Sequence, residues 1–226
     1  QYFLGDFDRS RKLLERAVCR LDRPVPQNAL PLARGLLTAT ATQVAHLVLP
    51  GRFRDRRRAE KAVLDEVVDG YKILGQISYL NGESPAELVY VECASLNIGE
   101  EAGSSPALAT ALANAAGVAS LMNLRRLADR YLARAVQMGE AEGQSEALAY
   151  VWNINGLIEA QRGGWRKGIA ANDRALEAFG EIGDYNLEAE IWQTRSALHL
   201  FAGDFRGAEP CWTRTREFAA RNENPQ

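Results

Sequence analysis

A turn signal that returns about every forty residues constrains this chain more than any other feature of its sequence. A helical pattern that ends at glycine and restarts two residues later occurs at Gly82, Gly163 and Gly203, and Met122 stands in the equivalent place between the first two. The intervals are 40, 41 and 40 residues. A fixed period in this range is typical of stacked helix-turn-helix units, each of which buries its apolar face against the next.

Three further sets of positions keep the same register. Seventeen residues after the turns we expect the units to end, because glycine readily adopts the left-handed conformation that stops a helix: Gly99, Gly139, Gly180 and Ala220. Small residues stand seven residues before the turns, and they predict that the two helices of each hairpin cross closely: Gly75, Ala115, Gly156 and Ser196. Four residues before these small residues stands a mostly aromatic set, which we expect to form a buried wedge of rings one helical turn away: Tyr71, Ala111, Trp152 and Trp192.

The chain is predicted to be all-α, an αα-superhelix of helical hairpins with a period of about 40 residues. No sustained alternation of apolar and polar residues marks a strand. We expect about ten helices in a single repeat region: a half repeat in 1–23, atypical helices and a basic linker in 24–63, and repeats in 64–104, 105–144, 145–184 and 185–222. Before the first full turn, helices are expected in about 8–21, 28–49 and 55–80.

Composition excludes several classes of protein. The 27 Lys+Arg against 29 Asp+Glu give a formal net charge of −2, without the basic excess of a general nucleic-acid binder. Cys19, Cys93 and Cys211 lie far apart, which indicates neither a disulfide framework nor a thiolate zinc site and favours the reducing cytoplasm. The most apolar stretch, Gly35–Gly51, is too short and too polar for a membrane span, so we expect a buried helix there. The chain begins at Gln1 without a signal-peptide pattern, so we expect a segment of a longer protein.

The repeat pattern resembles tetratricopeptide-like repeats with longer helices. It is clearest at Trp152, Gly156, Gly163, Trp165 and Ala175, and again at Trp192, Ser196, Gly203, Phe205 and Ala208. More narrowly, the runs LDRPVP (21–26) and HLVLPGRFR (46–54), and the segment 79–101 ending in SLNIGEE and followed by AGSSP, resemble the C-terminal repeat region of large bacterial predicted ATPases. In that family an AAA-like ATPase module, often preceded by a class III nucleotide cyclase or a protein kinase domain, is followed by such repeats. The resemblance implies that the catalytic domains of the parent protein lie outside this segment.

No catalytic or cofactor-binding motif accompanies the repeats. The phosphate-binding pattern GxxxxGK[ST] is absent, so the ATPase machinery is not expected here. His46 and His199 have no His or Cys three or four residues away, which indicates core or interface histidines and not metal ligands. The paired carboxylates are expected on solvated helix faces: Glu100-Glu101, Asp65-Glu66 and Glu140/Glu142. We therefore predict no catalytic residue, no cofactor and no metal.

Two surfaces are candidates for binding a partner. The first helix of each hairpin is expected to line a concave groove, where polar residues are suited to holding a peptide or helix: Asp69, Lys72, Gln76, Asn153, Gln161, Glu190 and Gln193. Six cations near the start of the third helix form a basic patch suited to an acidic surface, a nucleotide phosphate or nucleic acid: Arg52, Arg54, Arg56, Arg57, Arg58 and Lys61. Pairing of these cations with carboxylates of neighbouring repeats is the competing interpretation.

The expected function is non-enzymatic. We expect a repeat segment that mediates protein–protein interaction or regulatory signalling, with a protein, a peptide or other domains of the same chain as its partner. No membrane partner is expected, and nucleic acid is disfavoured. One alternative is the ligand-sensing repeat arm of a LuxR-type ATPase transcription regulator, which a helix-turn-helix encoded downstream of Gln226 would favour. Another is an α-helical hydrolase, which a sealed cavity with two facing carboxylates would favour.

Overall fold

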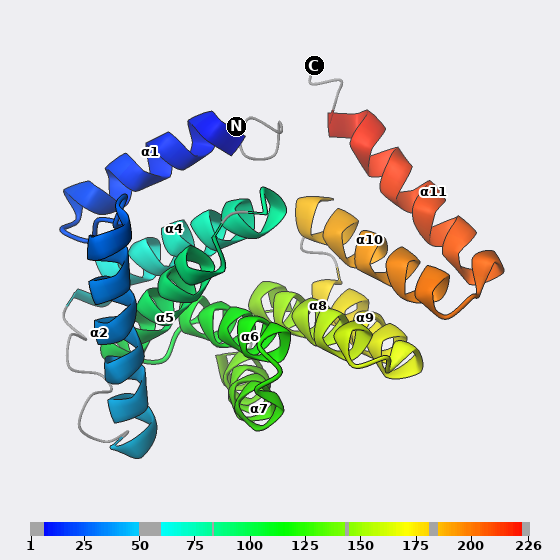
Figure 1. The fold of residues 1–226 in the computed structure, drawn as a ribbon. Coiled ribbons are helices and arrows are strands. Elements are labelled where there is room, and N and C mark those ends of the chain that lie inside the picture. The colour runs from blue at the N-terminus through cyan, green and yellow to red at the C-terminus, as the bar shows by residue number, and fades with distance from the viewer. Residues whose placement is uncertain (1–6, 50–59, 83, 143–144, 181–184, 223–226) are drawn as a thin grey trace.

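The computed structural model describes residues 7–49, 60–82, 84–142, 145–180 and 185–222. Within these residues the chain forms ten α-helices and no strand, which confirms the predicted all-α fold (Figure 1). The helices are α1 (Phe7–Arg20), α2 (Ala29–Val48), α4 (Lys61–Leu80), α5 (Pro85–Ala102), α6 (Pro106–Leu121), α7 (Arg125–Glu142), α8 (Ser145–Gln161), α9 (Trp165–Phe179), α10 (Tyr185–Phe201) and α11 (Phe205–Asn222). The bounds expected for the first two helices from the sequence agree with α1 and α2 to within one residue.

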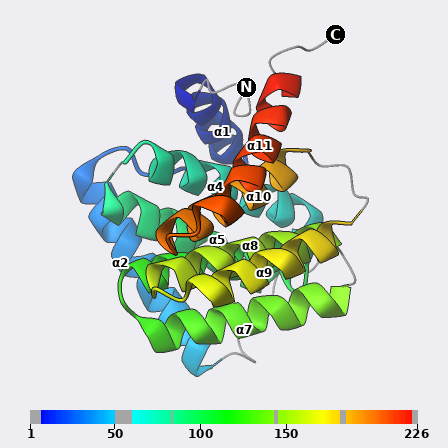
Figure 2. The same ribbon diagram turned by 90° about the vertical axis from the view of Figure 1, so that its right-hand side faces the viewer.

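Four successive helical hairpins stack side by side. α4 pairs with α5, α6 with α7, α8 with α9, and α10 with α11. The first helices also contact one another in chain order, α4 with α6, α6 with α8 and α8 with α10. They form the inner layer of a curved stack, and the second helices form its outer layer (Figures 1 and 2). This is the superhelix of hairpins that the forty-residue repeat predicts.

The apolar cores are shared between neighbouring hairpins. Ala107 and Ala111 of α6 belong to the same cluster as Leu64 and Leu74 of α4. A second cluster joins α5, α6 and α7 to Val151 of α8, and a third joins α8 and α9 to α10. Each hairpin therefore depends on the next for burial of its apolar side chains, as in other repeat architectures.

α1 and α2 are placed differently from the hairpins. α1 packs on α4, where Val18 enters the first core cluster, and α2 packs across α5. The expectation that Gly35–Gly51 forms a buried helix is wrong for the residues that the structure describes, because four of their large apolar side chains are exposed: Leu37, Val44, Val48 and Leu49. The residues that α2 does bury are Ala39, Gln43 and His46, two of which are polar. Among the described residues, no helix is long and apolar enough to cross a bilayer.

The turns of the hairpins confirm the repeat and correct its register at one place. Gly82, Gly163 and Gly203 all have positive φ values, of 63°, 74° and 75°. In the hairpin of α6 and α7 the residue with positive φ is Asn123, at 59°, and not Met122, which has a φ of −80°. Asparagine tolerates the left-handed conformation better than most residues, which explains how this turn forms without glycine.

We expect Asn123→Gly to raise the free energy of unfolding by about 0.5–1 kcal/mol, because glycine adopts the left-handed conformation without a steric penalty. Met122→Gly is the matched control, since Met122 has right-handed backbone angles and glycine there only adds freedom to the unfolded chain. Urea titration followed by circular dichroism measures both variants. Equal effects of the two substitutions would contradict the corrected register.

Two of the glycines expected to end the helices do something else. Gly99 and Gly139 lie inside α5 and α7, so the prediction that they stop these helices is wrong. A Cβ atom at Gly99 would lie 3.1 Å from Leu108 Cδ1, and one at Gly139 would lie 3.1 Å from Leu148 Cδ1. These glycines therefore let the next hairpin approach closely, in the same way in two successive repeats. Gly180, with a φ of 50°, does follow the end of α9 as predicted.

The predicted aromatic wedge is buried in one repeat only. Tyr71 is 2% exposed, but Trp152 and Trp192 are half-buried. The Arg174 guanidinium lies 4.6 Å from the centroid of the Trp152 ring and covers part of it. The buried aromatic residue of α8 is Tyr150, two residues earlier. Its hydroxyl group turns out to belong to a polar cluster of the inner layer.

Candidate functional site

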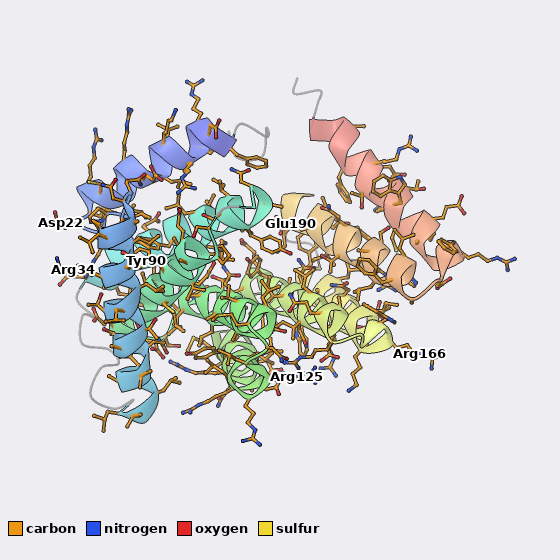
Figure 3. All side chains as sticks on the ribbon, viewed as in Figure 1. Asp22, Arg34, Tyr90, Arg125, Arg166 and Glu190 are labelled. Carbon is orange, nitrogen blue, oxygen red and sulfur yellow. The ribbon has the colours of Figure 1, made fainter. Side chains whose placement is uncertain are left out.

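The inner layer brings together part of the predicted groove. Lys72 and Gln76 of α4 both meet Tyr150 of α8: the Lys72 Nζ lies 5.2 Å from the Tyr150 ring centroid, and Gln76 Nε2 donates to the Tyr150 hydroxyl at 3.4 Å. Asp69 lies one turn before Lys72, with 4.0 Å between Asp69 Oδ1 and Lys72 Nζ. Figure 3 shows Glu190 near the N-terminal end of α10.

The remaining predicted groove residues are placed elsewhere. Asn153 is 3% exposed and accepts a hydrogen bond from Asn172 Nδ2 of α9 at 3.2 Å. Its side chain thus serves the pairing of α8 with α9 and does not reach the surface. Gln161 is exposed but is the last residue of α8, and Gln193 is exposed on α10. The surface built around Lys72, Gln76 and Tyr150 is therefore smaller than the sequence suggested.

A buried carboxyl group lies behind this surface. The Tyr150 hydroxyl donates to Asn114 Oδ1 of α6 at 2.8 Å. Glu92 of α5, which forms a hydrogen bond with Asn114, is 4% exposed, and its Oε2 has no hydrogen-bond partner among the described residues. Burial raises the pKa of Glu92 to about 8, and the bond to Asn114 offsets only part of this. At neutral pH Glu92 is therefore mainly protonated.

Gly75 explains how this carboxyl group fits between the helices. A Cβ atom at position 75 would clash with the Glu92 carboxyl, so glycine leaves the space that this carboxyl occupies. Gly156 plays the same part for Asn172, whose Nδ2 would lie 2.8 Å from an added Cβ. The small residues before the turns thus accommodate a polar side chain from the second helix at these two positions. The sequence predicted close backbone crossing and gave no signal for these polar occupants.

The inner surface around Asp69 is acidic. Burial raises the pKa of Asp69, and the carboxylates of Glu66, Asp65 and Glu146 raise it further, whereas Lys72 lowers it. Asp65 is paired with Lys61 at 2.8 Å. Glu190 of α10 lies close enough to Tyr150 that its charge raises the pKa of the Tyr150 hydroxyl, after burial, which has the larger effect. Carboxylates from α4, α8 and α10 thus converge on one side of the molecule.

Most of the predicted basic patch lies outside the described residues, namely Arg52, Arg54, Arg56, Arg57 and Arg58. Lys61 is described, and it pairs with Asp65 one turn later in the same helix, α4, and not with a carboxylate of a neighbouring repeat.

A second polar cluster joins α2 to the repeats, and it corrects the prediction for one carboxylate. Glu100 was expected on a solvated face, yet it is 1% exposed. It accepts hydrogen bonds from His46 Nδ1 at 2.6 Å and Gln43 Nε2 at 3.1 Å, and it pairs with Arg134 of α7. His46 is also 1% exposed, as expected for a core histidine. The other paired carboxylates that the structure describes are half-buried or exposed.

The cluster fixes α2 against α5 and α7. Asn97 Nδ2 donates to the Ala39 carbonyl at 2.8 Å, and the Tyr131 hydroxyl donates to Gln43 Oε1 at 3.0 Å. Burial alone would raise the pKa of Glu100, but the bonds from His46, Arg134 and Gln43 outweigh it and lower the pKa to about 2. Glu100 is therefore ionised and fully bonded, which is the state of a structural ion pair.

Reactive groups suited to catalysis do not converge in the described residues. Burial raises the pKa of the Cys93 thiol to about 11, which leaves it protonated and unreactive at neutral pH. His199 is partly buried beside the turn between α10 and α11, with 2.9 Å between its Nδ1 and Asp204 Oδ2. Within the described part of the chain, no group of three or more His, Cys, Asp or Glu residues is placed to hold a metal ion.

No family model matches the sequence, and no curated protein matches it. Among solved structures, BtubC (BKLC) from P. vanneervenii is similar, with a TM-score of 0.47 and 17% sequence identity over 86% of this chain and 95% of that chain.

Proposed function

We propose that this chain is a non-catalytic helical-repeat segment that binds a basic protein segment on its inner layer. The observation that carries the proposal is the convergence of carboxylates from three first helices on one surface. Helical-repeat proteins use the layer formed by their first helices as an extended surface for a peptide or helix. A segment rich in lysine and arginine complements the negative charge of this surface.

A polar side chain beside the carboxylates also offers hydrogen bonds to such a segment. Gln76 is half-buried, and its one bond here, from Nε2 to the Tyr150 hydroxyl, is long at 3.4 Å. The Gln76 amide therefore offers hydrogen bonds to the main chain of a bound segment, whereas the buried Tyr150 hydroxyl is already held by Asn114. Lys72, which lies over the Tyr150 ring, separates the Asp69 end of the surface from the Gln76 end. It favours a partner whose cations are spaced apart over one whose cations are contiguous.

The partner that we propose is another domain of the parent protein. The support is the sequence resemblance to the repeat regions of bacterial ATPases, in which ATPase, cyclase or kinase modules precede the repeats. In this interpretation the segment regulates those domains in the bacterial cytoplasm by holding a basic element of them.

We expect a fluorescein-labelled peptide rich in lysine and arginine to bind the purified chain, and its counterpart with glutamate at every basic position not to bind. The double variant Asp69→Asn/Glu146→Gln should weaken binding by about two- to thirtyfold, because each exposed charge contributes about 0.2–1 kcal/mol. Added salt should weaken binding further, since it screens exposed charges. Fluorescence anisotropy measures all three effects.

The matched control is Glu140→Gln/Glu209→Gln, which removes two exposed carboxylates from the second helices α7 and α11. The control should bind the basic peptide as the unchanged chain does. Equal binding of both peptides, or equal losses in both double variants, would refute the proposed surface. Nucleotide hydrolysis or cyclase activity by the purified segment would refute its non-catalytic nature.

A further inference from the structure

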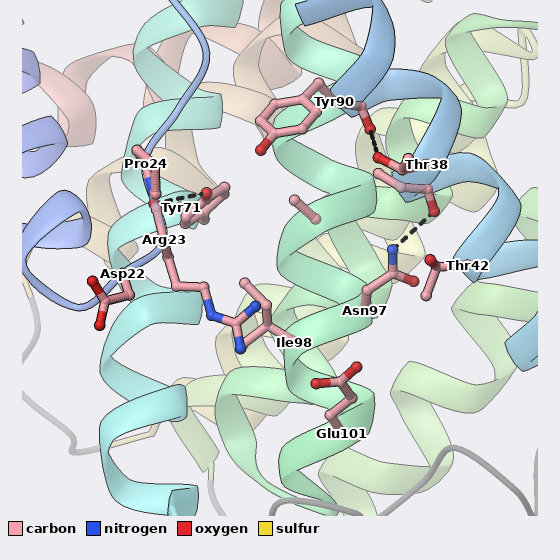
Figure 4. Close-up of a pocket in the computed structure, with 13 residues that line it drawn as sticks. Asp22, Arg23, Pro24, Thr38, Thr42, Tyr71, Tyr90, Asn97, Ile98 and Glu101 are labelled. Carbon is pink, nitrogen blue, oxygen red and sulfur yellow. Dashed lines mark hydrogen bonds between the residues drawn. The ribbon is translucent and has the colours of Figure 1, made fainter. Parts of the chain in front are cut away.

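A separate pocket lies where α2, α4 and α5 meet the segment that follows α1. Its volume is about 310 Å³. Figure 4 shows Arg23 reaching into it from the chain segment beside Pro24, with Glu101 at its lower end and the rings of Tyr71 and Tyr90 above. None of these residues belongs to the inner surface described above.

Three charged side chains line the pocket; Asp22 is exposed, whereas Arg23 and Glu101 are half-buried. Arg23 and Glu101 have opposite sign and do not pair with each other. Within the described residues, neither the Arg23 guanidinium nor the Glu101 carboxylate forms an ion pair with any group. Opposite charges that share a pocket without contact are complementary to a ligand that carries both charges.

The frame around these charges is held in place by hydrogen bonds. The Arg23 N–H donates to the Val18 carbonyl at 2.9 Å, and the Arg23 carbonyl accepts from the Tyr71 hydroxyl at 3.1 Å. Asn97 on the opposite wall is 8% exposed and is held by the Ala39 carbonyl at 2.8 Å. The backbone of Arg23 and the wall facing it are therefore fixed before any ligand binds, which lowers the entropic cost of binding.

One glycine maintains the shape of the pocket at α2. A Cβ atom at Gly35 would lie 2.9 Å from Tyr90 Cε2, so the absence of a side chain lets the Tyr90 ring lie against α2. Ala39, Ala94 and Ile98 give the pocket an apolar part between the charged ends. A size of a few hundred Å³ is typical of small-molecule sites. Most of the residues that line this pocket carry a polar group, as a charged ligand requires.

We propose that this pocket binds a small zwitterion with an aliphatic part, of the amino-acid type. Arg23 binds its carboxylate, Glu101 binds its ammonium group, and the aliphatic part contacts Ile98 and the two alanines. The pocket adjoins the buried cluster of Glu100, because Asn97 lines the pocket and accepts from Gln43, which bonds to Glu100. A ligand here thus adds contacts between α2 and the repeats.

The test is isothermal titration of the whole chain with L-leucine and two derivatives that each lack one charge. N-acetyl-leucine has no ammonium group, and leucinamide has no carboxylate. We expect leucine to bind, and each derivative to bind at least about tenfold more weakly, because a hydrogen bond to a charged group contributes more than a neutral one. Alanine, valine and methionine extend the series to other aliphatic parts.

Two pocket variants and two control variants test which side chain binds which charged group of the ligand. Arg23→Gln should abolish the advantage of leucine over leucinamide, and Glu101→Gln should abolish its advantage over N-acetyl-leucine. Arg20→Gln and Glu140→Gln remove exposed charges outside the pocket and should bind as the unchanged chain does. The derivatives test the unchanged chain and so do not depend on the folding of any variant. Absence of binding by all four amino acids, or equal binding of leucine and both derivatives, would overturn the proposal.

Discussion

Replacing Glu100 with alanine is expected to lower the free energy of unfolding by about 3–5 kcal/mol, because the substitution breaks a buried ion pair and leaves its partners unsatisfied. His46 and Gln43 would lose a charged acceptor in the interior, and Arg134 would lose its carboxylate partner. Urea titration followed by circular dichroism measures the loss. Glu140→Ala, at an exposed position of α7, is the control and should change stability by less than about 0.5 kcal/mol.

The same carboxylate gives the stability a dependence on acid. The pKa of Glu100 is lowered from its ordinary value of 4.5 to about 2 in the folded chain. Its contribution is therefore fully present above pH 4.5 and is lost as the pH falls toward 2. The Glu100→Gln variant should lack this part of the acid dependence. The comparison runs from about pH 5 to pH 2, which spans the unfolded and folded pKa values of Glu100. If the unchanged chain and Glu100→Gln lost stability in parallel over this range, the Glu100 ion pair would not be the cause of the acid dependence.

The second large effect is expected at the opposite end of the pH range and comes from Glu92. Its pKa is raised from 4.5 to about 8 in the folded chain, so the unfolded chain releases this proton at lower pH than the folded chain does. The contribution of Glu92 to stability is then greatest below pH 4.5 and falls as the pH rises toward 8, by about 3–5 kcal/mol over this interval. Denaturant titrations at a series of pH values measure this fall.

Glu92→Gln removes the ionising group and keeps its size. The stability of the variant should therefore not decline between about pH 5 and pH 8, the interval between the unfolded and folded pKa values of Glu92. Near pH 8, about the folded pKa value, the variant should be more stable than the unchanged chain. Glu146→Gln, at an exposed carboxylate of α8, is the control and should keep the decline. A decline that persists unchanged in Glu92→Gln would show that other groups cause it.

The inner layer was only partly predictable from the sequence. Lys72 and Gln76 were identified as surface residues of a first helix, because their positions lie off the apolar face of a helical repeat. Asn153 was assigned to the same surface by the same rule, but it is buried against Asn172. The rule fails there because Gly156 opens a space between α8 and α9 that a polar pair fills. Tyr150, Asn114 and Glu92 gave no signal, since a polar residue on a helix is ordinarily exposed.

The all-α class, the hairpins and their stacking could be predicted from the sequence alone. A turn residue that recurs at a fixed interval and apolar residues at helical spacing are local properties, and local properties decide where helices begin, end and pair with their neighbours. The burial of Glu100 could not be predicted from the sequence, because it depends on α2 crossing α5. His46 and Glu100 are 54 residues apart, and no repeat period relates them. The pocket of Arg23 and Glu101 arises from the same crossing, since its walls come from segments that only packing brings together.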